Sequence, residues 1–193
     1  YAMEIKEGDQ LIQAKISNGE DSIIMATKEG KSIRFIETQV RPTGRRTKGV
    51  RGIMLGETDE VIGMLIAKRE GTVLVASENG YGKRSDLDEY RVQSRGGKGV
   101  YTMKKTHKTG NLISILEAVE NDDLMIITTQ GVMIRQPVDS IRIIGRNTQG
   151  VRLLRLDDGA TISSVTKVIK DEDDNESDET NPQNETPSEE NTE

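Results

Sequence analysis

Short apolar strands alternate with glycine-containing turns along this chain, and the arrangement recurs about every fifty residues. A strand, a turn glycine and a second strand occupy residues 23–35, 73–84 and 125–135, around Gly30, Gly80 and Gly131. Downstream of each, a polar loop ends at a Gly-Val pair, at residues 49–50, 99–100 and 150–151. A period of about 20–50 residues is the sequence signature of a repeat architecture. We therefore expect a fold built from repeated units.

Each repeat contains about four short strands and no helical stripe. In the first repeat the strands are expected at residues 11–16, 23–27, 32–36 and 50–55, separated by Gly-containing turns. The second strands, such as residues 124–127, are continuously apolar, as expected when both faces of a strand are covered. Four antiparallel strands in a repeat of this length are typical of propeller blades. The pattern predicts an all-β, propeller-like fold with about three whole four-stranded blades.

The predicted folded part covers residues 1–169, with repeats at about 10–60, 61–111 and 112–161 and partial blades at 1–9 and 162–169. Three blades do not close a ring, so the terminal blades would expose an apolar face or an unpaired strand edge. Upstream blades, or self-association with a second copy of the chain, would have to cover these edges. Because the chain begins at Tyr1 and not at methionine, we expect a piece of a longer protein.

Charge is divided unevenly along the chain. The sequence has 27 basic and 33 acidic residues, but residues 170–193 hold eleven acids and one base. Residues 1–169 therefore have 26 bases against 22 acids, which makes the body a basic surface. The acidic tail has almost nothing to bury, and we expect it to be disordered. This tail is either a solvated end, or it competes intramolecularly with the ligand for the basic surface of residues 1–169.

The residue content excludes several functional classes. There is no cysteine, and His107 is the only histidine, so no metal site is expected. Residues 44–49 have the glycine spacing of a phosphate loop, but Val50 and Arg51 follow where lysine and a hydroxyl residue are required. No run of about 18 apolar residues and no charged-then-apolar leader occurs. We expect a cytoplasmic protein without a membrane span.

Superposing the repeats reveals three columns of arginine. The first follows the turn glycine by four residues, the second follows it by eleven, and the third precedes the Gly-Val pair by four. In this order the columns are Arg34, Arg84 and Arg135; Arg41, Arg91 and Arg142; and Arg45, Arg95 and Arg146. Further charge stands beside the third column at Arg46, Lys48 and Lys98.

Each column has two interpretations. An arginine at a fixed place in every repeat can bridge neighbouring blades or cap strand carbonyls, with acids such as Glu37 and Asp86 as partners. It can also bind the phosphates of duplex DNA, because a guanidinium matches phosphate oxygens with two parallel hydrogen bonds. Both interpretations stay open for the first two columns. The third lies in acid-free loops with glycines such as Gly96 and Gly97, whose amides could approach the same oxygens, and here the sequence favours phosphate contact.

One basic loop per blade would place positive charge at regular steps around a rim that duplex DNA can follow. Aromatic residues make up only 3% of the chain, which argues against stacking on single-stranded nucleic acid. Binding of this kind is nonspecific in sequence and depends steeply on salt. Bending 20–30 base pairs by 40–90° costs about 1–6 kcal/mol, which several phosphate contacts can exceed.

Three stretches carry a resemblance to a known family. They are Gly-Val-Arg-Gly-Ile-Met-Leu-Gly at residues 49–56, Glu-Asn-Gly-Tyr-Gly-Lys-Arg at 78–84, and Ile-Gly-Arg-Asn-Thr-Gln-Gly-Val at 144–151. They are similar to the closing blades of the C-terminal domain of DNA gyrase A, and the similarity covers residues 1–169 and the acidic tail. It implies a six-bladed β-pinwheel with strands exchanged between blades. In that family the domain wraps DNA, so that ATP-driven strand passage by an A2B2 type II topoisomerase introduces negative supercoils.

The resemblance also implies that the chemistry lies in other parts of the enzyme. The family's signature box, Gln-Arg-Arg-Gly-Gly-Lys-Gly, lies in the first blade, and Gln93–Gly99 is its degenerate equivalent in a later blade. The cleavage tyrosine follows an arginine directly, whereas Tyr81, Tyr90 and Tyr101 do not. We expect a non-catalytic, cofactor-free segment, with ATP and Mg²⁺ used elsewhere. The implied partners are double-stranded DNA, the rest of gyrase A, and gyrase B.

Two alternatives remain beside this interpretation. The C-terminal domain of the topoisomerase IV protein equivalent to gyrase A has fewer or degenerate blades and does not wrap DNA strongly; the complete third repeat and the long acidic tail favour gyrase. The other alternative, from a different class, is a propeller that binds proteins through its top face, in which the basic charge would be incidental.

Overall fold

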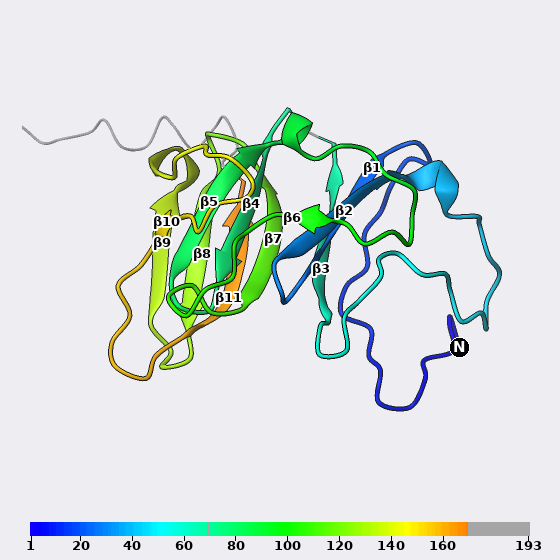
Figure 1. Ribbon diagram of the computed structural model, residues 1–193, viewed down its shortest axis with the longest axis horizontal. Coiled ribbons are helices and arrows are strands. Elements are labelled where there is room, and N and C mark those ends of the chain that lie inside the picture. The colour runs from blue at the N-terminus through cyan, green and yellow to red at the C-terminus, as the bar shows by residue number, and fades with distance from the viewer. Residues whose placement is uncertain (69, 170–193) are drawn as a thin grey trace, which may run out of the picture.

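The computed structural model describes residues 1–68 and 70–169, which form three antiparallel sheets arranged side by side (Figure 1). The first has the strand order β3-β1-β2-β6, from Val61–Ala67, Ser22–Thr27, Lys31–Ile36 and Val100–Tyr101. The second has the order β7-β4-β5-β10, from Leu112–Ala118, Thr72–Ser77, Tyr81–Asp86 and Val151–Arg152. The third has the order β11-β8-β9, from Ile162–Val168, Asp123–Thr128 and Met133–Pro137. Three short 3-10 helices follow β2, β5 and β9: η1 (Glu37–Gln39), η2 (Leu87–Glu89) and η3 (Val138–Ser140).

Strands are exchanged between repeats. The hairpin of β1 and β2 belongs to the first repeat, but both flanking strands come from the second. β3 pairs with β1, and β6 pairs with β2 through Ser32 opposite Val100. The second sheet repeats this arrangement with β7 and β10, where Gly82 lies opposite Val151. The predicted all-β pinwheel with four-stranded antiparallel blades is therefore confirmed, and within the described residues the third sheet has three strands.

Two of the strands expected in the first repeat are wrong. Residues 11–16 carry no strand, because the place beside β1 is taken by β3, with Met25 opposite Met64. Residues 50–55 carry none either. In the next two repeats the segments equivalent to 50–55 are β6 and β10. Each of them is a strand because it pairs with the hairpin of the repeat before it, and residues 1–20 contain no such hairpin. A sheet thus combines residues 22–67 with 100–101, and does not coincide with one contiguous repeat. The expectation of a disordered tail at 170–193 lies outside the described residues.

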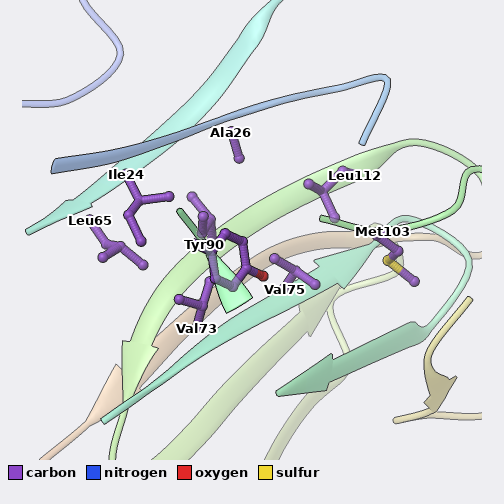
Figure 2. Packing of buried hydrophobic residues seen from close by; sticks show 9 residues of the cluster. Ile24, Ala26, Leu65, Val73, Val75, Tyr90, Met103 and Leu112 are labelled. Carbon is purple, nitrogen blue, oxygen red and sulfur yellow. The ribbon is translucent and has the colours of Figure 1, made fainter. Parts of the chain in front are cut away.

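The core consists of aliphatic layers between the sheets, as the composition requires. Figure 2 shows the layer between the first and second sheets, where Ile24 and Leu65 face Val73 and Val75 around the ring of Tyr90. Tyr90 is 1% exposed, and its hydroxyl lies 2.6 Å from the Thr102 hydroxyl. Burial raises the pKa of the Tyr90 hydroxyl, so this tyrosine is a neutral core residue.

Two further apolar clusters complete the core. Leu74 and Ala76 of the second sheet pack with Leu124, Ile126 and Val138 of the third repeat. A smaller cluster of Ile33, Phe35 and Ile53 covers the other side of the first sheet. Each sheet is therefore held by apolar contact with its neighbours, which fixes the loops that cross between them.

Candidate nucleic-acid interface

The basic loops cross the outer edges of the sheets. β3 and β7, and β7 and β11, are in contact with one another, so these strands lie on the inside, and β2 and β5 lie toward the perimeter. The loop at 91–99 runs along β2, where the amide of Gln93 donates to the Arg34 carbonyl at 2.8 Å. The loop at 142–150 runs along β5 in the same way, with Ile144 donating to the Arg84 carbonyl at 2.9 Å. Each loop thus reaches from its own repeat onto the blade before it.

The first arginine column joins neighbouring blades. Arg34 donates from Nη1 to the carbonyl oxygens of Leu87 and Tyr90, at 3.1 and 3.2 Å. Arg84 is 3% exposed and donates from Nε to the Ile141 carbonyl at 2.7 Å. Both side chains satisfy backbone groups at the 3-10 helix of the next blade. Arg34 and Arg84 are therefore removed from the expected set of DNA contacts.

Arg135, the third member of the first column, pairs with an acid of its own sheet and not with the next blade. Arg135 forms an ion pair with Asp123 inside the third sheet, at 2.6 Å between Nε and Oδ2. Glu37 accepts hydrogen bonds from the Ser17 hydroxyl and the Gly19 amide, and not from an arginine. The side chain of Arg135 remains 55% exposed, but its charge is compensated. It is a weaker candidate for phosphate than an unpaired arginine.

The third column also joins blades through two of its members, Arg95 and Arg146, and their contact with phosphate stays a prediction. Arg95 donates from Nε to the Gln39 carbonyl at 3.0 Å and from Nη1 to the Arg51 carbonyl at 2.5 Å. Arg146 makes the equivalent bonds to the carbonyls of Glu89 and Tyr101, at 3.1 and 2.8 Å. These guanidinium groups hold the loops in place with one N–H of Nε and one of Nη1, and the second N–H of Nη1 and both of Nη2 are left for a further acceptor.

An acid also lies at this loop. The carboxylate of Glu89 accepts from the Arg146 amide at 2.6 Å, although the loop itself contains no acidic residue. The repeat offset hides this contact in the sequence, because Glu89 belongs to the preceding repeat. Arg45, the first member of the column, is exposed and has no hydrogen-bond or ion-pair partner for its side chain among residues 1–68 and 70–169.

The loop glycines serve close packing between blades. The amide of Gly96 donates to the Gly52 carbonyl at 2.7 Å, and the Gly97 carbonyl accepts from Met54 at 2.9 Å. A Cβ on Gly99 would collide with the Ser32 carbonyl. The expected role of the Gly96 amide as a phosphate donor is therefore wrong, since a carbonyl already occupies it.

The second column is the exposed one. Arg41, Arg91 and Arg142 lie on the surface, and in the part of the chain that the structure describes none of them has a hydrogen bond or an ion pair through its side chain. Lys48 and Lys98 are likewise exposed at equivalent places in their loops. We call the following residues the rim set: Arg41, Arg45, Arg46, Lys48, Arg91, Lys98 and Arg142. They are the cations of the predicted site whose side chains have no partner among residues 1–68 and 70–169.

Lys83 contributes to the interface and was missed by the sequence analysis. Its side chain is buried, and Nζ donates to the Gly145 carbonyl at 2.6 Å, to the Thr148 hydroxyl at 3.2 Å and to the Arg146 carbonyl. Burial lowers the pKa of the Lys83 ammonium to about 8. The equivalent residues are Ile33 and Ile134. The sequence did contain a signal for this role, because Lys83 is a lysine at a repeat position where the other two repeats have isoleucine.

Other kinds of site find no support in the described residues. His107 lies in an exposed turn. Over residues 1–68 and 70–169, no group of three or more His, Cys, Asp or Glu side chains is placed to hold a metal ion. The same part of the chain contains no helix long and apolar enough to cross a membrane.

Strand-exchanged blades that each carry a basic loop across the outer edge define a propeller-type β-pinwheel. The family described as DNA gyrase C-terminal domain, beta-propeller, matches residues 21–68, 71–116 and 122–169. The chain belongs to this family, and the resemblance found in the sequence is confirmed.

Relatives and solved structures agree with this assignment. The DNA gyrase A protein of Staphylococcus epidermidis (strain ATCC 12228 / FDA PCI 1200) is 45% identical over 176 residues, which are 90% of this chain and 20% of the relative. The equivalent protein of Staphylococcus aureus (strain MRSA252) is 43% identical over 180 residues, 92% of this chain and 20% of the relative. The chain therefore spans about a fifth of the length of these relatives.

A solved DNA gyrase A C-terminal domain superposes with a TM-score of 0.80 at 29% identity, over 87% of this chain and 57% of that one. The C-terminal domain of a DNA topoisomerase IV gives a TM-score of 0.82 at 24% identity, over 87% and 53%. At that identity the second likeness shows the shared fold alone.

Proposed function

We propose that this chain binds duplex DNA without sequence specificity along the rim set and bends the DNA around its outer edge. The observation that carries the proposal is the second arginine column. Arg41, Arg91 and Arg142 occupy the same place in three successive repeats, are exposed, and have no side-chain partner within residues 1–68 and 70–169. Their charges recur once per blade, which is the arrangement that a curved phosphate backbone can follow.

The buried contacts give this surface its rigidity. Arg95, Arg146 and Lys83 fasten the loops at 91–99 and 142–150 to the blade before each of them. A loop that is already fastened loses little further backbone freedom when its side chains bind phosphate. The exposed cations then neutralise phosphates and release counterions, which supplies the free energy needed to bend the duplex.

The wider role follows from the family. Because the relatives are DNA gyrase A proteins, we infer that the chain works within an A2B2 DNA gyrase, with the rest of gyrase A and with gyrase B as partners, in the bacterial cytoplasm. It supports negative supercoiling by holding a wrapped DNA segment and performs no bond chemistry itself. ATP and Mg²⁺ act in other parts of that enzyme, and this segment requires no cofactor.

The rim is tested by removing its charges in a matched design. The variant R41Q/R91Q/R142Q removes three rim arginines, and the control K6Q/K108Q/R155Q removes three exposed cations outside the basic loops. Binding to a labelled duplex is followed by fluorescence anisotropy over a range of salt. We expect the rim variant to bind more weakly, with a salt dependence of log K less steep by about 0.9 for each phosphate that is no longer neutralised. The control should keep the parent slope.

Equal slopes for both triple variants would overturn the rim assignment. Wrapping is tested separately with a complete gyrase A protein that carries the same three substitutions. The protein is bound to relaxed circular DNA, and a nicking-closing enzyme then relaxes the part of each circle that the protein does not hold. The protein is removed, and the change in the linking number of the DNA is measured. We expect the rim variant to reduce this change, whereas an unaltered change would show that other residues do the wrapping.

A further inference from the structure

An open groove lies where segments of all three repeats meet, in the middle of the chain. Its walls are Glu29 of the first hairpin turn, Tyr101 of β6 with the turn that follows it, and Asn147 of the third-repeat loop. Backbone contact holds these walls together, because the Lys104 amide donates to the Thr148 carbonyl at 2.9 Å. The groove is therefore built into the junction between the second and third repeats.

The groove and Arg142 of the rim set lie toward opposite ends of the third-repeat loop. Arg142 stands at the start of this loop, next to the bridge between Ile143 and Arg84. The loop ends at Val151, which pairs with Gly82 nearer to the hairpin turn, and the groove lies toward this end. A duplex that contacts Arg142 and the groove together is thus held at two levels of the outer edge.

Cations outnumber acids in and beside the groove. Lys104 and Lys105 line it, and Glu29 is the one acid among its lining residues. Lys105 pairs with Glu29 at 2.7 Å between Nζ and Oε1. The Lys31 ammonium lies 6.0 Å from the centre of the Tyr101 ring. In the part of the chain that the structure describes, the side chains of Lys31 and Lys104 have no hydrogen bond or ion pair.

The turn that carries two of these lysines is already ordered by its own hydrogen bonds. Thr109 is buried, and its hydroxyl accepts from the Thr106 amide at 2.9 Å. The Gly110 amide donates to the Thr106 carbonyl at 3.0 Å. A turn of this kind loses little further backbone freedom when its side chains bind a ligand.

Two adjacent cations occur at this place in the second repeat alone. The residues equivalent to 104 and 105 are Met54 and Leu55 in the first repeat, and Arg155 and Leu156 in the third. Acids follow within a few positions in both of those repeats, at 57, 59 and 60 and at 157 and 158, whereas residues 106–110 contain none. The positive charge at this level therefore belongs to the middle blade and not to the repeat as such.

We propose that this groove binds backbone phosphate of the duplex that lies along the rim set, and that Glu29 weakens the contact by holding Lys105. The inference rests on the proposed function, because it requires a duplex on the outer edge. Charge complementarity and the continuity of the groove with the loop that carries Arg142 argue for this ligand. A second line of phosphate contact at one blade restricts the tilt of the duplex across the outer edge.

The donors at the groove suit a phosphate group. The ammonium groups of Lys31 and Lys104 and the side-chain amide of Asn147 offer N–H donors without an acidic partner among the described residues. Arg146, which donates from Nη1 to the Tyr101 carbonyl at 2.8 Å, adds its remaining N–H groups beside them. Hydrogen bonds from charged donors to phosphate are about twice as strong as those between neutral groups.

A pair of double variants tests the cations of the groove. K31Q/K104Q removes the two lysines without a described partner, and K6Q/K108Q removes two exposed lysines outside the groove. Binding to a labelled duplex is followed by fluorescence anisotropy over a range of salt. We expect K31Q/K104Q to bind more weakly, with a slope of log K against log salt less steep by about 0.9 for each phosphate lost. K6Q/K108Q should keep the parent slope. K104Q alone, at an exposed position, repeats the test without altering β2.

A second pair of variants tests the role of Glu29. E29Q releases Lys105, whereas E60Q releases Lys28 from an equally exposed ion pair of 2.8 Å that lies outside the groove. Both variants remove one negative charge from the chain. We expect E29Q to bind the duplex more tightly and to steepen the slope by about 0.9, and E60Q to keep the parent slope.

The rim variant R41Q/R91Q/R142Q is measured beside these variants, so that the two proposals can fail separately. A parent slope in both K31Q/K104Q and K104Q, together with a reduced slope in the rim variant, would overturn the groove and leave the rim assignment standing. Parent slopes in all of them would overturn both. An equal effect of E29Q and E60Q would show that Glu29 acts through net charge alone, which would overturn its assigned role.

Discussion

The Arg84 guanidinium donates from Nε to the carbonyl oxygen of Ile141 at 2.7 Å, across the junction between the second and third blades. Arg34 makes the equivalent bond to Tyr90 one junction earlier. The recurrence of this contact explains why an arginine follows the turn glycine by four residues in both of these repeats. The period of the first arginine column therefore follows from how blades are joined, although a column of DNA contacts would have the same period.

Replacing Arg84 with leucine should destabilise the fold. The substitution removes a buried donor and leaves the Ile141 carbonyl unsatisfied, which costs about 1–3 kcal/mol of the free energy of unfolding. Urea denaturation measures the loss. Arg91→Leu is the control, because this exposed arginine has no side-chain partner among the described residues and its replacement should change stability by less than about 0.5 kcal/mol. A similar loss in both variants would contradict the assignment of the two columns.

Lys83 should make stability depend on pH above neutrality. Burial lowers the pKa of its ammonium to about 8 in the folded chain, against 10.5 for an ordinary lysine. Between these pH values the unfolded chain holds more protons than the folded one, so the free energy of unfolding rises as pH increases from about 8 to about 10.5. Below pH 8 the lysine is charged in both states, and its burial carries the full desolvation cost.

Lys83→Met separates this effect from other titrations. The variant should lack the Lys83 contribution, so the difference between the two unfolding free energies should change across that pH window. Urea denaturation of parent and variant at matched pH values measures the difference. Two parallel pH profiles would show that Lys83 titrates normally.

Arg146 and Arg45 occupy equivalent sequence positions but should respond differently to alanine. Arg146→Ala removes two hydrogen bonds to the carbonyls of Glu89 and Tyr101, at a cost of about 1 kcal/mol of stability for each net bond. Arg45→Ala removes a side chain without a described partner and should leave the stability of the monomeric chain unchanged. Thermal unfolding at low concentration compares them. In DNA binding, Arg45→Ala should reduce the salt slope; equal melting temperatures would contradict the blade-joining role of Arg146.

A Gly80→Ala substitution should be more damaging than Gly131→Ala. Both glycines have φ between +82° and +83°, so both substitutions carry a backbone strain of about 1–2 kcal/mol. Only at Gly80 does the new Cβ also lie 2.6 Å from a backbone carbonyl, that of Leu154. Overpacking of this kind adds about 1–3 kcal/mol. Denaturation of the monomeric chain measures the difference, and equal losses would show that the blades separate without cost.

The repeat, the strand class and the family were all accessible from the amino-acid sequence. Turn glycines such as Gly30 and Gly80 can be recognised because a left-handed φ restricts the residue type at one position, and a fifty-residue period makes that restriction visible. The apolar strands were also clear, since burial on both faces demands continuous aliphatic residues. Constraints of this kind act on a residue and its neighbours in the sequence, so they can be recognised without the structure.

The partners of each strand and each arginine were decided only in the tertiary structure. Whether Arg91 or Arg95 is free depends on which carbonyls of the preceding blade come within reach, and those carbonyls lie about fifty residues away. The exchanged strand β6 and the Lys83 side chain also have their partners in another repeat, on β2 and in the loop at 142–150. Equivalent positions share a residue type both when they join blades and when they face solvent. Sequence alone therefore determined that a cation stands once per blade, and packing between blades determined which of these cations remain exposed and without a partner among the described residues.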